Sequence, residues 1–133
     1  MTTEEARLIT KGNVYASQFL GAWVTFCHLL DDLVDKDKPA DDKRIVSEVL
    51  LFLEAIVVNP WGRDHSALLW PLIVTSSNAW LDSNKKTGAE ADVLKGMYHE
   101  VVWFTAFLCG GQQHMQEMTS RFREYDFEQQ GEK

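Results

Sequence analysis

The sequence has few residues that interrupt or cross-link a chain, and it is short of positive charge. Its 133 residues include 3 prolines, 8 glycines and 2 cysteines, and 13 basic residues stand against 20 acidic ones, for a formal charge of −7. Nucleic-acid binding needs a basic stripe that neutralises phosphates, and the net acidity argues against one, so we expect no nucleic-acid partner. Two cysteines without CxxC spacing provide neither a zinc motif nor a disulfide framework, and we expect both thiols to be reduced.

Signals for secretion and for membrane insertion are also scarce. The chain starts Met1-Thr-Thr-Glu-Glu, without the positive charge and apolar core of a secretory signal, and we expect a cytoplasmic protein. Three stretches lack Lys, Arg, Asp and Glu, at 13–30, 65–81 and 101–116, but polar side chains that are costly in lipid interrupt each of them. We interpret these stretches as buried helices and expect no membrane partner.

Apolar residues recur at helical spacing along most of the chain, and turn residues separate the helices. After a short N-terminal segment (1–12), helices are expected at about 13–36, 39–58, 64–84, 89–109 and 112–125, followed by a frayed tail at 126–133. In the second of these helices, the residues expected to point inward are Ile45, Val49, Phe52, Leu53 and Ile56. The connections are short, so the sequence predicts a single all-α domain over 1–133, an antiparallel four- to five-helix bundle.

Several of these helices are uncharged around most of their circumference, and one small bundle cannot bury every side of them. We therefore expect a homo-oligomer, most simply a dimer. Trp103 and Phe107 lie off the main apolar stripe of their helix and are the expected interface anchors.

An acidic cluster ends the first long helix. Asp31, Asp32 and Asp35 share one face with His28, which lies one turn earlier. Clustered carboxylates resist ionisation unless a cation lies among them, and oxygen-rich sites of this kind suit Mg²⁺ or Mn²⁺. The alternative is a solvated helix end whose charge is balanced by nearby lysines, namely Lys36, Lys38 and Lys43.

The segment Asp31-Asp32-Leu33-Val34-Asp35 resembles the DDxxD motif of the isoprenoid synthases, the polyprenyl and terpene synthase superfamily. The resemblance implies that Asp31 and Asp35 bind Mg²⁺ that grips a substrate diphosphate inside an all-α bundle. It covers those five residues only, and the chain has no second DDxxD motif.

A second polar stripe is expected to face the aspartates. Asn78 and Asp82 lie on the third long helix, and in an up-and-down bundle they would stand near the level of Asp32 and Asp35. The predicted metal ligands are therefore Asp31, Asp32, Asp35, Asn78 and Asp82. Glu100 lies in an apolar stretch, so we expect it to be at least partly buried and able to act as a base for an attacking water.

Two functions follow from these observations. The first is a Mg²⁺ or Mn²⁺ carboxylate site that binds or hydrolyses a phosphate or diphosphate compound, with a phosphorylated small molecule as its partner. The second is a non-enzymatic, oligomeric helical accessory or assembly protein whose acidic residues only keep it soluble.

Overall fold

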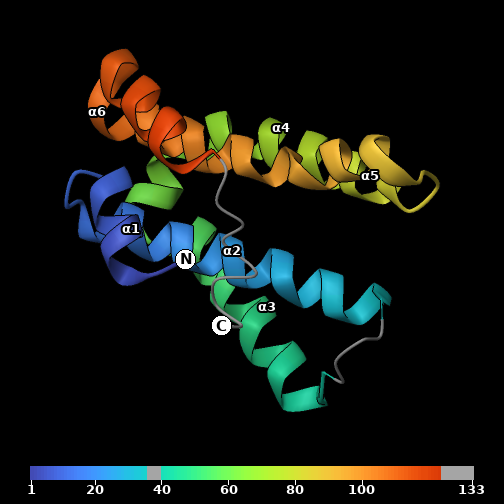
Figure 1. Cartoon of the computed structure of the whole chain (residues 1–133). Coiled ribbons are helices and arrows are strands. Elements are labelled where there is room, and N and C mark those ends of the chain that lie inside the picture. Colours follow the sequence, from blue (N-terminus) through green and yellow to red (C-terminus); the bar gives the residue numbers. More distant parts are fainter. Residues whose placement is uncertain (36–39, 124–133) are drawn as a thin grey trace.

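The computed structural model describes residues 1–35 and 40–123, and every regular element within them is helical (Figure 1). In chain order the elements are α1 (Thr3–Ile9), α2 (Val14–Asp35), α3 (Asp42–Val57), α4 (Pro60–Ser83), α5 (Gly88–Lys95), the short 3₁₀ helix η1 (Gly96–Tyr98) and α6 (His99–Phe122). The all-α prediction is confirmed. Pro39, the expected first residue of the helix at 39–58, and the expected tail at 126–133 lie outside the described residues.

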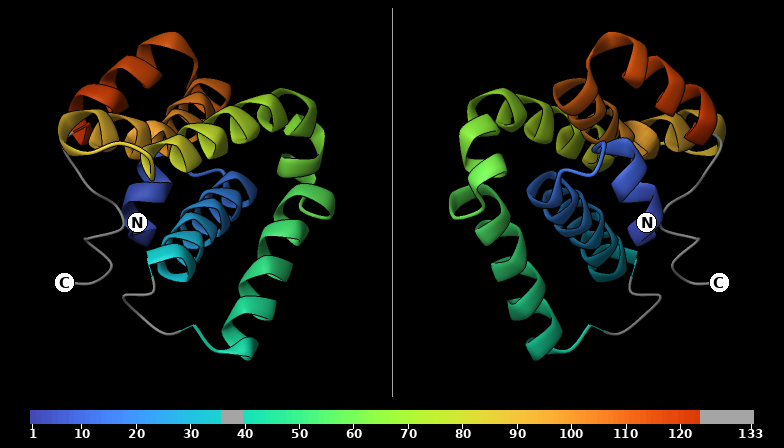
Figure 2. Two further views of the ribbon diagram at one scale, coloured as in Figure 1. Left: turned by 90° about the vertical axis from the view of Figure 1, so that its right-hand side faces the viewer. Right: turned by 90° about the vertical axis from the view of Figure 1, so that its left-hand side faces the viewer.

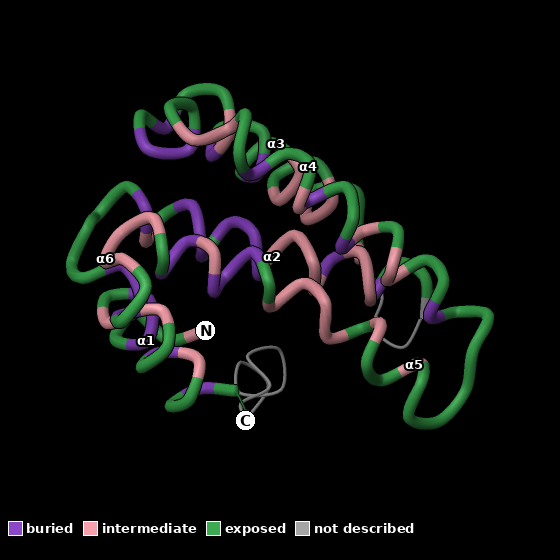
Figure 3. The backbone as a smooth tube through the Cα atoms, turned by 90° about the horizontal axis from the view of Figure 1, so that it is seen from above, coloured by how far each residue is buried: buried purple, intermediate pink, exposed green. Residues whose placement is uncertain are grey.

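Helix α2 lies in the interior of the molecule and contributes much of its core (Figure 2, Figure 3). The Asn13 side chain caps its start by accepting the backbone N–H of Ala16 at 3.0 Å. Phe19, Leu20 and Trp23 are fully buried. Because α1, α3, α4 and α6 all contact α2, its charge-free stretch is covered from several directions.

The N-terminal segment folds back onto the core as α1. The Thr2 hydroxyl accepts the backbone N–H of Glu5 at 3.1 Å, and the Glu5 carboxylate accepts the backbone N–H of Thr2 at 2.6 Å, which forms a capping box. Gly12 then reverses the chain with a φ of 78°. His114 of α6 donates from Nε2 to the Ile9 carbonyl at 2.7 Å and so joins the two ends of the described chain.

Helices α3 and α4 meet at a sharp corner, with an angle of 89° between them. The buried Asn59 side chain accepts the N–H of Gly62 at 3.0 Å and donates to the Tyr15 carbonyl of α2 at 3.0 Å. At Gly62 a Cβ atom would lie 1.8 Å from the Ala55 carbonyl oxygen, so only glycine lets the two helices approach this closely. The expectation that α4 begins near Asp64 is wrong, because Asn59 and Pro60 already provide its cap and first turn.

The expected helix at 89–109 is divided into two. Gly96–Tyr98 forms the 3₁₀ helix η1, and the Trp23 indole donates to the Tyr98 carbonyl at 3.1 Å, which ties this break to α2. The predicted break at Gly110-Gly111 is confirmed, because Gly111 has a φ of 88° and the second half of α6 continues in a new direction. A Cβ atom on Gly110 would lie 2.4 Å from the His114 ring, so this turn also requires glycine.

The helices pack as two roughly antiparallel pairs, α2 with α3 and α4 with α6, and the α3–α4 corner joins the pairs (Figure 1, Figure 2). Consecutive helices are therefore not all antiparallel, since α3 and α4 are nearly perpendicular. No single helix in the described ranges is long and apolar enough to cross a membrane; α3 and α4 pass that test only when they are taken together across their bend.

Candidate functional site

The acidic end of α2 lies against the first turn of α3. Arg44 Nη1 is 2.9 Å from Oδ2 of Asp32, and His28 Nε2 is 3.4 Å from the same oxygen. Asp32 is only 7% exposed, and a carboxylate in that environment is costly unless a positive group accompanies it. Arg44 supplies that charge from within the chain.

Neighbouring side chains on α3 hold Arg44 in this position. Asp41 caps the helix by accepting the Arg44 backbone N–H at 2.7 Å, and Glu48 accepts from Arg44 Nε at 3.1 Å. Burial by itself would lower the pKa of Arg44, but its ion pair with Asp32 and the charge of Glu48 outweigh that effect and raise the pKa. The guanidinium therefore stays charged between the two carboxylates.

Arg44 was not predicted as the partner of the cluster. The lysines considered as its alternative charge balance were Lys36, Lys38 and Lys43, of which the first two lie outside the described residues. The available signal was Asp41, a residue type that often begins a helix, because a helix that starts there carries Arg44 in its first turn.

The structure places the predicted metal ligands on two helices, with the three aspartates on α2 and Asn78 and Asp82 on α4. Asp31 is half-buried next to Asp32, whereas Asn78 and Asp82 are exposed on α4. Asp35 ends α2, and its side chain lies outside the described part of the chain. Among the residues that the structure describes, no three His, Cys, Asp or Glu side chains are grouped so that they could hold a metal ion. The metal site remains a prediction from the sequence.

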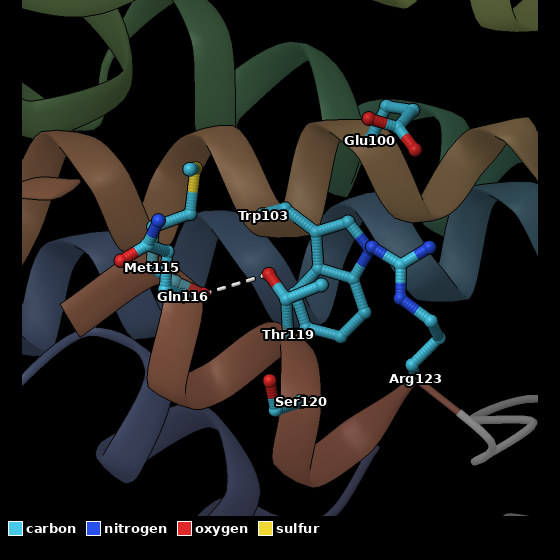
Figure 4. Close-up of a pocket in the computed structure, with 7 residues that line it drawn as sticks. All are labelled: Glu100, Trp103, Met115, Gln116, Thr119, Ser120 and Arg123. Carbon is cyan, nitrogen blue, oxygen red and sulfur yellow. Dashed lines mark hydrogen bonds between the residues drawn. The ribbon is translucent and has the colours of Figure 1, made fainter. Parts of the chain in front are cut away.

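Glu100 lies at a separate place, in a pocket between the two halves of α6 (Figure 4). The pocket has a volume of about 460 Å³, and its lining residues are Glu100, Trp103, Met115, Gln116, Thr119, Ser120 and Arg123. None of the predicted metal ligands is among them. Glu100 is exposed, so the expectation of partial burial was wrong. The chain bends at Gly111, and residues from both sides of this bend line the pocket.

The outer side of α3 carries a row of apolar side chains that face solvent. Val46, Leu50, Leu53 and Val57 are 57%, 58%, 49% and 63% exposed. Their spacing of four, three and four residues places them along one line of the helix. We call these four residues the α3 stripe. The side of α3 that packs against the core buries Phe52 and Ala55.

Two residues, Leu53 and Trp103, have the opposite exposure to the one expected from the sequence. Leu53 was expected to point inward, but α2 covers only one side of α3 and Leu53 lies on the other. Trp103 was expected to anchor an interface, but it is 6% exposed and belongs to the core of its own chain. Phe107 is 42% exposed, so the structure leaves it accessible.

Helix α4 also has exposed apolar residues, namely Leu68, Trp70, Val74 and Leu81, of which the last three lie in one row. Polar side chains interrupt this second row, because Asn78 lies on the same line and Asp82 lies beside it. The apolar surface of α4 is therefore less continuous than the α3 stripe.

Comparison of the chain with models of protein families, with curated proteins and with solved structures gives no match. Two features of the fold bear on function: the Asp32–Arg44 ion pair at the end of α2 and the apolar residues exposed on α3.

Proposed function

We propose that the protein is a non-catalytic, self-associating helical protein and that the α3 stripe is the surface through which its copies meet. The observation that carries this proposal is the exposure of four aligned apolar side chains, each about half exposed or more. Apolar rows at heptad spacing form the seams along which helices associate in water.

The energetics favour a reversible assembly. Complete burial of a Val or Leu side chain contributes roughly 1.5–3 kcal/mol, so burying the exposed half contributes about 1 kcal/mol for each residue. Four residues on each of two copies then contribute about 8 kcal/mol, against an association cost of about 4–15 kcal/mol. We therefore expect an oligomer that forms as the protein concentration rises and dissociates on dilution.

The charge distribution at the end of α2 supports a structural role for Asp32. Its ion pair with Arg44 joins α2 to α3 and helps to orient the helix that carries the stripe. In this account the acidic cluster contributes to the fold and requires no added cation.

Sedimentation equilibrium of a Leu50→Lys variant tests the proposal. A lysine at this position places a charge on the stripe, and Glu54 one turn later keeps the helix electrostatically favourable. Wild type should show a concentration-dependent mass above 15.2 kDa, and the variant should stay at that mass. The matched control is Val93→Lys on α5, where the native side chain is 67% exposed, and it should associate as wild type does. If wild type stays monomeric, the proposal is wrong.

A second proposal retains the divalent cation. The last turn of α2 contains no basic residue, so the helix dipole and the aspartates both favour a positive charge there. In this proposal Mg²⁺ or Mn²⁺ binds at Asp31 and Asp32 and holds a phosphate or diphosphate compound. Thermal unfolding with each metal tests it, because a bound ion raises the melting temperature of the native chain.

A further inference from the structure

The α3 stripe reads the same in both directions along the helix. Its residues are Val, Leu, Leu and Val, and their spacing of four, three and four is also symmetric. A two-fold axis placed midway between Leu50 and Leu53 therefore exchanges those two positions, and it exchanges Val46 with Val57. The surface is its own complement when a second copy is laid against it in the opposite direction.

We infer that the α3 stripe pairs with the α3 stripe of a second copy in an antiparallel, two-fold symmetric dimer. Leu50 then packs against Leu53 of the second copy, and Val46 packs against Val57 of the second copy. This inference rests on the proposed self-association and adds its geometry. A two-fold contact uses the same patch on both chains and closes the assembly at two copies, whereas a contact between unlike patches would continue into a ring or filament.

The charges along the stripe agree with this pairing. The four stripe residues are uncharged, and Ser47 and Glu54 lie together along one edge of the row, both exposed. In an antiparallel two-fold pair the corresponding edges of the two helices face each other, so Glu54 lies beside Ser47 of the second copy. No two like charges meet at that edge, and no charged side chain has to be buried there.

The exposed row on α4 of a second copy is a less favourable partner for the α3 stripe than another α3 stripe. Asn78 interrupts it, and an amide buried against Leu50 or Leu53 would lose its contacts with water. The α3 stripe offers an unbroken apolar partner of the same length, so pairing like with like buries more apolar surface at a lower polar cost.

Cysteine cross-linking measures the direction of the pairing. In a background carrying Cys27→Ala and Cys109→Ala, the variants are Val46→Cys and Val57→Cys, both at exposed positions. In the antiparallel dimer the two copies of residue 46 are about 16 Å apart along the helix axes, since eleven residues rise by 1.5 Å each. Residue 46 of one copy lies opposite residue 57 of the other. A short bifunctional maleimide should therefore link the mixture of the two variants at least tenfold more than either variant alone.

Two control variants show whether the cross-link forms through the α3 stripe. Val93→Cys on α5 is the off-face control and should remain unlinked, and adding Leu50→Lys to both variants should abolish the link in the mixture.

Efficient linking of Val46→Cys alone would show a parallel pair and overturn the inference. A dimer by sedimentation in which neither the variants nor their mixture are linked would overturn it as well, while self-association would stand. If the wild-type protein is a monomer by sedimentation, both the proposed self-association and the inferred antiparallel pairing are wrong.

Discussion

Asp32 Oδ2 lies 2.9 Å from Arg44 Nη1, and this ion pair joins the acidic end of α2 to the first turn of α3. Replacing Arg44 with Met would leave a buried carboxylate without its principal counter-charge. We expect Arg44→Met to lower the free energy of unfolding by about 2–3 kcal/mol, somewhat below the loss for a fully buried pair because the arginine is partly exposed. Urea denaturation gives the value.

A double-mutant cycle with Asp32→Asn isolates the coupling between these two residues. Asn at this position removes the charge that Arg44 balances, so the double variant should be less destabilised than the sum of the single variants. Strict additivity would show that the two side chains do not stabilise each other, and the structural role assigned to Asp32 would be lost.

Added Mg²⁺ or Mn²⁺ distinguishes the two proposed functions. A site filled at a hundred times its dissociation constant adds about 2.7 kcal/mol, which raises the melting temperature on the order of 10 °C. The self-association account expects no rise with either metal, because Arg44 already balances Asp32. Melts at one protein concentration, with a chelator control, make the comparison. A rise that Asp31→Asn abolishes would favour the metal site instead.

Gly62 should tolerate no side chain. The Cβ atom of Gly62→Ala would meet the Ala55 carbonyl oxygen, so the α3–α4 corner must open and the Asn59 hydrogen bonds must lengthen. We expect a loss of about 3 kcal/mol or more, measured by urea denaturation. Gly21 has open space at its Cβ position, so Gly21→Ala is the control and should be neutral or stabilising. Equal effects at the two positions would contradict the geometry of the corner.

The Cys109 thiol should react slowly in the folded protein. Burial raises its pKa to about 11, and only the thiolate attacks a maleimide or disulfide reagent. At pH 8 the thiolate fraction is then about a hundredfold lower than for a thiol with an ordinary pKa near 8.5–9. In a Cys27→Ala variant, labelling should be about a hundredfold slower in buffer than in urea, and it should accelerate as the pH rises toward 11. Equal rates in the two solvents would contradict the burial.

The helices could be predicted from the sequence because their caps and breaks are local. The break between the helices expected at 89–109 and 112–125 depends only on Gly110 and Gly111, and the structure confirms it. The partner of Asp32 could not be predicted in this way, because contact with Arg44 depends on how α3 packs against α2. The same holds for Leu53, whose helix is apolar on several sides. Which side of α3 is covered depends on where α2 and α4 pack against it, and the local sequence does not show this.

The mass of the wild-type protein in solution tests the central claim most directly. Light scattering or sedimentation equilibrium between about 1 and 100 µM should show a mass that rises with concentration toward twice the 15.2 kDa of one chain and then levels off. Leu50→Lys should remain at the mass of one chain throughout. A wild-type mass of 15.2 kDa at every concentration would contradict the account, because the α3 stripe would then remain exposed to water without a second copy to cover it.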